Sequence, residues 1–175
     1  LLCPQLIVVP GRHGVYDEYS HQVMNHCYDL TNLVEQISID EAFLDVSDLR
    51  PPAEAIAREL QATIWNEHGL PCSLGVASNK LIAKIANNIG KAEKRSPNPP
   101  MAIKVVPPGE EAAFLAPLPV GELWDIGPKT TTSLTGMGIA TIGDLVRWPE
   151  ADLVQRFGKS GADLAQRARG LDDRP

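Results

Sequence analysis

The chain has 175 residues, of which 43% are hydrophobic and 22% charged, and its formal net charge is -6. A chain of this length can bury a core as one or two domains. No apolar run approaches the roughly 18 residues that cross a bilayer, and we expect no membrane partner. The odd number and wide spacing of Cys3, Cys27 and Cys72 exclude a paired disulfide framework and a C-x-x-C metal site. The four histidines show no metal-ligand spacing either, and we expect a cytoplasmic protein with reduced cysteines.

The first 36 residues predict a short strand and then a helix. Residues 6–9 are apolar and favour a strand. From residue 15 to residue 36 apolar side chains recur at helical spacing, which predicts an amphipathic helix with Tyr16 and Tyr19 on its packed face. The chain opens without a Met, so we expect it to be a piece of a longer protein.

Residues 37–46, with the sequence ISIDEAFLDV, predict a strand that turns at Asp40 and Glu41. The stretch is dense in β-formers, and its large apolar residues occupy opposite parity before and after the acidic pair. A hairpin tip carrying two carboxylates fits this pattern, because Asp favours turns and Glu is depleted from strands. Two adjacent anions repel each other unless solvent, a proton or a cation relieves the charge, and Mg²⁺ is the natural cation for such oxygens. For an isolated dipeptide, a solvated turn is the commoner alternative.

A second helix is predicted from Pro51 and Pro52 to about His68, with Gly69 as its stop and an apolar face of Ile56, Leu60 and Ile64. Residues 72–77 predict a third strand, residues 93–100 a polar, Pro-rich loop, and residues 101–106 a strand that closes the sheet.

Between these strands the sequence predicts a helix with a cationic stripe. Ser78 or Asn79 can cap it, Gly90 can end it, and its apolar face holds Leu81, Ile82, Ile85 and Ile89. Residues 79–106 contain six Lys or Arg and one Glu, so this patch rather than the negative total would meet phosphates. A solvated helix face is the commoner alternative for the stripe, which consists of Lys80, Lys84, Asn87 and Lys91.

Residues 107–109 mark a boundary, beyond which short helices separated by Gly and Pro predict a small α domain. Residues 123–130 predict a helix, a tight turn and a helix: Gly127 permits an unusual backbone, and Pro128 suits a first helical position. The following helix N-terminus can hold a DNA phosphate with help from Lys129, although an ordinary corner between two helices ranks equally on this pattern. Residues 158–161, which include Lys159, predict a second and weaker site of this kind.

Three of these stretches, in this order, resemble Y-family (translesion) DNA polymerases of the bacterial polymerase IV type. SIDEAFLDVS resembles the palm motif of that family, residues 78–91 resemble its lysine-containing segment, and residues 123–145 resemble its helix-hairpin-helix thumb. The resemblance covers nearly the whole chain and implies an α+β fold. It implies the trailing end of the fingers at residues 1–11, a palm with an antiparallel-containing sheet and without its first strand at residues 12–106, and an all-α thumb at residues 107–175.

The resemblance also implies roles for single residues. Asp40 and Glu41 would hold two catalytic Mg²⁺ ions together with an Asp on the first palm strand, which this chain lacks. Lys91 would bind the incoming triphosphate. Asp125 departs from the family, where a glycine is common, and its charge would weaken the grip on a phosphate. Asp45 and Asp48 are candidates to replace the missing metal-binding carboxylate. The favoured interpretation is that both are solvated residues at a strand end. The residues implied to contact DNA are Gly127, Lys129, Thr130 and Lys159.

The function implied is DNA-directed DNA synthesis, a nucleotidyl transfer, on damaged templates in DNA repair. The partners implied are primer-template DNA, deoxynucleoside triphosphates and a sliding clamp, the last through C-terminal segments absent from this chain. The chain alone is expected to be inactive. One alternative is a non-catalytic DNA-binding module or inactive polymerase relative. Another is a different palm-based enzyme such as a nucleotidyl cyclase, against which the thumb-like domain argues.

Overall fold

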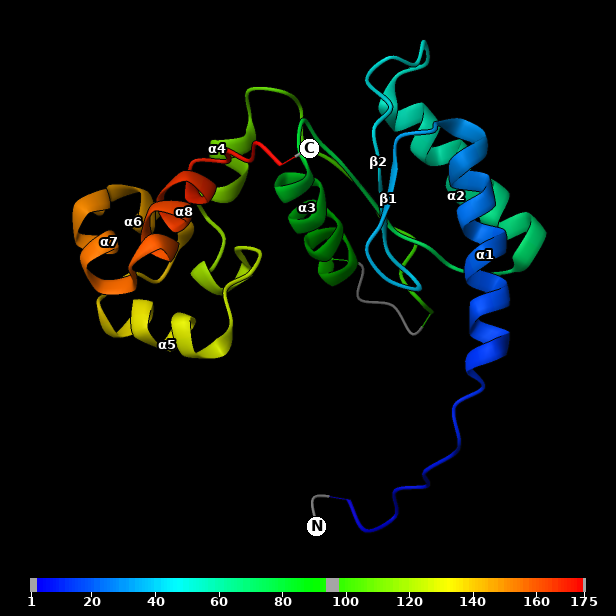
Figure 1. Cartoon of the computed structure of the whole chain (residues 1–175), viewed down its shortest axis with the longest axis horizontal. Coiled ribbons are helices and arrows are strands. Elements are labelled where there is room, and N and C mark those ends of the chain that lie inside the picture. The colour runs from blue at the N-terminus through cyan, green and yellow to red at the C-terminus, as the bar shows by residue number, and fades with distance from the viewer. Residues whose placement is uncertain (1–2, 94–97, 175) are drawn as a thin grey trace.

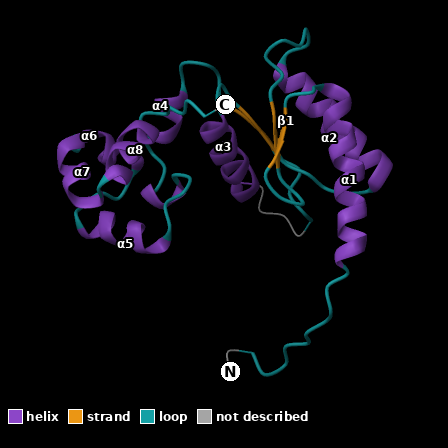
Figure 2. Cartoon of the chain, in the orientation of Figure 1, coloured by secondary structure: helices purple, strands orange, loops and turns teal. Residues whose placement is uncertain are grey.

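The computed structural model describes residues 3–93 and 98–174, and it has the predicted α+β fold class (Figures 1 and 2). Part of the predicted Pro-rich loop, including Lys94 and Arg95, lies outside the described residues. The elements are α1 (His13–Leu30), β1 (Val34–Gln36), β2 (Ala42–Leu44), α2 (Ala53–His68), β3 (Leu74–Val76), α3 (Lys80–Glu93), β4 (Ile103–Val105), α4 (Glu111–Leu115), the 3-10 helix η1 (Val120–Glu122), α5 (Pro128–Gly136), α6 (Ile142–Arg147), α7 (Glu150–Phe157) and α8 (Lys159–Ala168).

The strands lie between two helical layers. β1 pairs antiparallel with β2, and β3 pairs parallel with β4, so the described strands form two small sheets where the sequence predicted one. Figure 1 shows α1 and α2 on one side of the strands and α3 on the other. Buried residues of α1 and α2 pack together with strand residues in one cluster, which includes Met24, Cys27, Leu60 and Ile64.

The N-terminal part differs from the prediction in three respects. The first helix ends at Leu30, and Val34 begins a strand, because pairing with Leu44 places Val34 against the same apolar cluster without a helical backbone. Tyr16 and Tyr19 are exposed, since α1 buries the face of Ser20, Met24 and Cys27 instead. Residues 6–9 form no strand and are exposed, because they pair with no strand edge in the described part of the chain.

The next two helices follow the prediction more closely. α2 buries Ile56, Leu60 and Ile64, and Gly69 ends it in the left-handed conformation at φ 65°. Asn79 caps α3, because its Oδ1 accepts a hydrogen bond from the backbone N–H of Ile82 at 3.0 Å. Gly90 does not end this helix: it is buried within it, where a Cβ would come 3.1 Å from the Cβ of Lys104 in β4. That glycine allows the helix to approach the strand closely.

The C-terminal helices share a core with α3. Leu81, Ile82 and Ile85 of α3 belong to one buried cluster with residues from α4 to α8, such as Leu134 and Leu153. Helix α3 therefore lies between the strands and the C-terminal helices (Figure 1). None of the helices in the described residues is long and apolar enough to cross a membrane.

Candidate active site

The predicted acidic hairpin tip is present between β1 and β2. The backbone N–H groups of Ile37 and Ser38 both donate to the carbonyl oxygen of Glu41, at 2.8 and 3.2 Å, and close the turn. The hydroxyl of Ser38 donates to Oδ1 of Asp40 at 2.7 Å and accepts from the backbone N–H of Asp40 at 3.3 Å. Ser20 of α1 donates its hydroxyl proton to the carbonyl of Ile39, which ties the tip to the helix. The two carboxylates are thus presented on a turn with defined hydrogen bonds.

Two lysines of the cationic stripe are paired with this hairpin. Lys84 forms an ion pair with Glu41, and Lys80 forms one with Glu35 of β1. The side chains of Lys84 and Lys80 are only 19% and 22% exposed. A solvated helix face is therefore wrong for these two positions. The sequence pattern found the stripe but gave no sign of its ionic partners.

A cleft of about 1390 Å³ brings the predicted catalytic and triphosphate-binding residues together. Asp40 and Glu41 line it from the hairpin, and Lys91 lines it from the last turn of α3. Lys91 is exposed and makes no ion pair with another described residue, so its ammonium group is available to an anion in the cleft. Asn87 also lines the cleft, and its Oδ1 is buried without a hydrogen-bond partner among the described residues. The cleft combines a carboxylate pair with a separate cation.

The C-terminal segment forms a wall of the cleft that the sequence did not predict. The side chain of Asp172 is 4% exposed and accepts a hydrogen bond from the backbone N–H of Leu81 at 2.9 Å, at the start of α3. Burial alone would raise the pKa of Asp172, but hydrogen bonds and charge from Arg174, together with the N–H of Leu81, hold that pKa below its ordinary value. The Arg174 guanidinium lies 4.2 Å from the ring centroid of Trp124. These partners are too far apart in sequence for any spacing rule to connect them.

The predicted DNA-contacting residues lie outside the cleft. Pro128 begins α5 as predicted, with Lys129 exposed and Thr130 partly buried in its first turn. Gly127 has an ordinary extended backbone at φ -78°, so the unusual conformation predicted there is wrong; it occurs at Asp125, at φ 70°. Lys159 is exposed at the start of α8.

The two candidate substitute carboxylates differ in position. Asp45 lines the cleft, and its Oδ1 accepts a hydrogen bond from the backbone N–H of Ser47 at 2.9 Å. Hydrogen bonds from Ser47 lower the pKa of Asp45, so this group is held as a local turn acceptor. Asp48 is exposed and does not line the cleft. Both positions suit the interpretation of solvated residues at a strand end.

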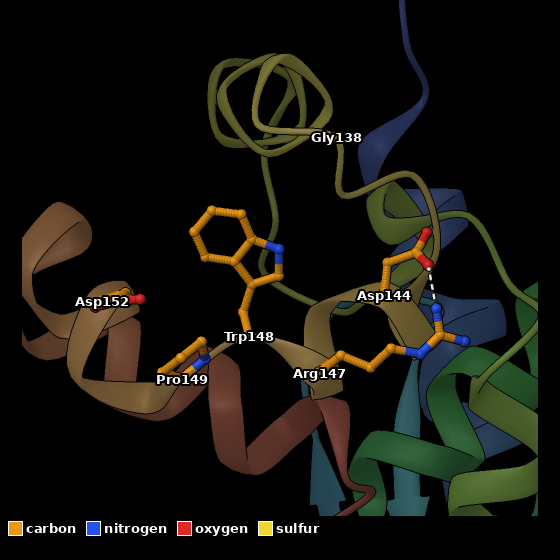
Figure 3. Close-up of a pocket in the computed structure, with 6 residues that line it drawn as sticks. All are labelled: Gly138, Asp144, Arg147, Trp148, Pro149 and Asp152. Carbon is orange, nitrogen blue, oxygen red and sulfur yellow. Dashed lines mark hydrogen bonds and ion pairs between the residues drawn. The ribbon is translucent and has the colours of Figure 1, made fainter.

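Two further features lie apart from this cleft. A small open pocket among the C-terminal helices contains the ion pair of Arg147 and Asp144 at 3.1 Å (Figure 3), but none of the predicted functional residues lines it. Between α1 and α2, Nε2 of His26 lies 2.9 Å from Nε2 of His68. The spacing of the histidines in the sequence gave no indication of this contact.

Comparison with known proteins identifies the family of the chain. Residues 1–88 match the impB/mucB/samB family, and residues 108–139 match the IMS family HHH motif. DNA polymerase IV of Shewanella oneidensis is 39% identical over 176 residues, which cover 99% of this chain and 47% of that protein. DNA polymerase IV of Methanoculleus marisnigri is 40% identical over 174 residues, which cover 98% of the chain and 46% of that protein.

Solved structures agree with these matches. DinB from Sulfolobus solfataricus superposes with a TM-score of 0.85 and 28% identity, covering 98% of this chain and 50% of that one. An insertion ternary complex of Dbh DNA polymerase gives a TM-score of 0.85 and 28% identity, covering 98% and 49%. The chain therefore spans about half the length of the relatives that it matches.

Proposed function

The chain belongs to the impB/mucB/samB family, the Y-family polymerases, and from this premise we propose that it is part of a DNA-directed DNA polymerase that copies damaged templates in repair. In this proposal residues 1–11 end the fingers, residues 12–106 form most of the palm, and residues 107–175 form the thumb. The observation that supports it best is the carboxylate pair Asp40–Glu41, presented on a hairpin tip in the same cleft as Lys91.

The carboxylate pair fits a hard divalent cation. Asp40 and Glu41 offer adjacent oxygen ligands, and Glu41 already attracts the ammonium group of Lys84. Mg²⁺ commonly binds one or two carboxylates together with substrate phosphates, so we propose Mg²⁺ at this position. Two such ions, when bound, supply charge neutralisation at the attacking and leaving oxygens of an in-line displacement. A further carboxylate would come from a palm segment outside this chain, because Asp45 is held by Ser47.

The lysines of α3 have separable roles in this proposal. Lys84 compensates the charge of Glu41 and keeps the hairpin tip against the helix. Lys91 lies about two helical turns further along, on the same polar face. It would steady the β- and γ-phosphates of a deoxynucleoside triphosphate, because a lysine ammonium is a mobile point charge that can follow phosphate oxygens.

The C-terminal helices would hold the primer-template DNA. The first turn of α5 offers unpaired backbone N–H groups beside Lys129, Thr130 and Gly127, and such a terminus suits a phosphate without reading a base. Lys159, at the start of α8, would contact a second phosphate of the DNA backbone. We place the protein in the cytoplasm with its DNA, and we assign recruitment of a sliding clamp to segments outside this chain.

Primer extension with Mg²⁺ tests the proposal in the natural full-length protein. We expect Glu41→Gln to abolish extension, because it removes a charged metal ligand without changing side-chain size. Asp48→Asn is the matched control, since Asp48 is an exposed carboxylate outside the cleft, and this variant should extend normally. Normal extension by Glu41→Gln would refute the assignment of the site. A parent protein that binds primer-template without extending it would support the alternative of a non-catalytic DNA-binding module or an inactive relative.

A further inference from the structure

Three side chains with metal-ligand chemistry meet between α1 and α2, away from the carboxylate cleft. Nε2 of His26 lies 2.9 Å from Nε2 of His68 and 3.4 Å from Oε2 of Glu67. All three ligand atoms lie within 4.8 Å of one another. Figure 1 shows α1 and α2 side by side on the face of the strands opposite to α3. The cluster therefore lies in the α1–α2 layer, whereas the proposed catalytic residues lie on the β1–β2 hairpin and on α3.

The two distances from Nε2 of His26 are close to an edge of a tetrahedral coordination shell, and the ligand atoms of Glu67 and His68 lie within 4.8 Å of each other. Ligands at the usual Zn–N distance of about 2.05 Å are separated by about 3.3 Å along a tetrahedral edge. The contact between His26 and Glu67 already has this length, and the two imidazoles need to separate by only about 0.4 Å. In the contact as it stands, one Nε2 must carry a proton for the other to accept. With both protons on Nδ1, two lone pairs would face the same point.

The surrounding structure holds these ligands in place. Met24 and Cys27 flank His26 on α1 and pack with Leu60 and Ile64 of α2, so the two helix axes are fixed relative to each other. The side chain of His26 is 20% exposed and that of Glu67 is 57% exposed, so the site is sheltered on one side and open to solvent on the other. A fourth position is thus accessible to a water molecule.

The electrostatics of α2 also favour a cation here. Glu67 and His68 occupy the last turn of this 16-residue helix, which ends at Gly69. The C-terminal end of a helix carries partial negative charge from its unpaired carbonyl groups, and Glu67 adds a full negative charge. Two imidazoles and one carboxylate select borderline transition metals, whereas Mg²⁺ and Ca²⁺ prefer an all-oxygen shell. His₂Glu with a water molecule is an established zinc ligand set.

We propose that His26, Glu67 and His68 bind one Zn²⁺ ion that fastens α1 to α2. This site is separate from the proposed Mg²⁺ site, and it does not depend on polymerase activity. Cobalt is a suitable probe, because Co²⁺ occupies zinc sites and absorbs visible light when it is tetrahedral. All proteins should carry Cys3→Ser, since Cys3 is an exposed thiol that could bind these metals by itself.

We expect the Cys3→Ser chain to bind one equivalent of Co²⁺ with visible absorption, and Zn²⁺ to displace it. His26→Gln and His68→Gln should lose the band, and Glu67→Gln should weaken binding. His21→Gln is the matched control, because His21 is exposed on the same helix and lies outside the cluster. Glu41→Gln controls for metal at the carboxylate pair. Free Zn²⁺ at about 100 times its Kd should raise the Tm by roughly 5–10 °C in the parent and in His21→Gln, but not in His26→Gln.

Circular dichroism checks that each variant folds without metal. His68→Gln is the safer of the two histidine variants, because His68 is the last residue of α2 and its substitution should disturb folding least. An equal cobalt band in folded His26→Gln and His68→Gln would overturn the proposal. So would the absence of stoichiometric binding by the folded Cys3→Ser chain, which would leave the two rings joined only by a hydrogen bond.

Discussion

Asp125 is the one non-glycine residue with a positive φ in the described part of the chain. The left-handed conformation is costly for most side chains, tolerated by Asp and Asn, and free for glycine. Glycine, which has no Cβ, would therefore relieve strain at this position. Asp125 does form an ion pair with Arg167 at 3.3 Å, but it is mostly exposed, and such pairs contribute little.

Substitution of Asp125 should separate backbone strain from charge. We expect Asp125→Gly to stabilise the protein by about 0.5 kcal/mol and Asp125→Ala to destabilise it by about 1 kcal/mol, because alanine disfavours a positive φ. Asp125→Asn removes the charge but tolerates the same backbone, so its stability should be close to that of the parent protein. Urea unfolding midpoints measure the differences. Equal stability of the Gly and Ala variants would contradict this explanation.

Asp172 couples stability to pH through its contacts with Leu81 and Arg174. Its pKa is lower in the folded protein than the ordinary value near 3.9, so its stabilising effect is complete above that value and is lost as pH falls through the folded pKa. We expect Asp172→Ala to cost about 1–2 kcal/mol at pH 7, where it removes a helix cap. The deficit should shrink between pH 5 and pH 2 in urea unfolding. Asp173→Ala, at an exposed neighbour, is the control, and a deficit that does not change with pH would refute the coupling.

Single residues were predictable where a short pattern determined them. Asp40 and Glu41 interrupt a run of β-formers, and the hairpin tip expected there is present. Gly127 and Gly90 were misassigned because glycine permits a turn or a helix end without requiring one. Gly90 instead meets a close neighbour, and the strained backbone lies at Asp125, where the residue type gave little signal.

At the scale of elements, the site depends on how closely α3 lies against β3. A Cβ added to Gly75 would come 1.9 Å from the carbonyl oxygen of Ala83 and 2.7 Å from the backbone N of Asn87. Both contacts are to helix backbone, which cannot rotate away as a side chain can. The position of Lys84, Asn87 and Lys91 along the cleft therefore rests on this glycine.

Gly75→Ala should force α3 away from the strand and destabilise the fold by about 1–3 kcal/mol or more. Gly136→Ala is the matched control, because it lies at the end of α5 with no atom within 4 Å of the added Cβ. That variant should be neutral or stabilised by up to about 1 kcal/mol. Thermal or urea unfolding distinguishes the two. If both variants are equally stable, the close approach is not required.

Helices whose start, apolar face and end are all marked in the sequence were predicted most accurately. α2 has a proline start, a regular apolar face and a glycine stop, and it was placed almost to the residue. The end of α1 was missed, because Val34 continues the helical period while it is also a good strand former, and pairing with Leu44 decided the outcome. Pairing partners are distant in sequence, and periodicity contains no information about them.

For the whole molecule, α3 joins the strands to the C-terminal helices. The side chains of Asn79 and Asp172 accept hydrogen bonds from backbone N–H groups at its N-terminus. Asn79 also donates to the carbonyl of Gly170 at 2.9 Å, across 91 residues. The family resemblance implied that the carboxylate pair and Lys91 serve one site, and all three residues line the same cleft. The pairing of Lys84 with Glu41 and the wall formed by Arg174 and Trp124 depend on tertiary packing, which no local pattern encodes.

In the proposed polymerase, the catalytic carboxylates and the residues that bind the DNA backbone lie in different parts of the molecule. The most direct test measures both single-turnover extension and primer-template affinity for Glu41→Gln and Lys129→Ala in the natural full-length protein. We predict that Glu41→Gln loses extension and keeps its affinity. Lys129→Ala should bind more weakly, with the slope of log K against log salt reduced by about 1, and extend normally at saturating DNA. Parallel loss of both properties in both variants would contradict this separation of catalysis from DNA binding.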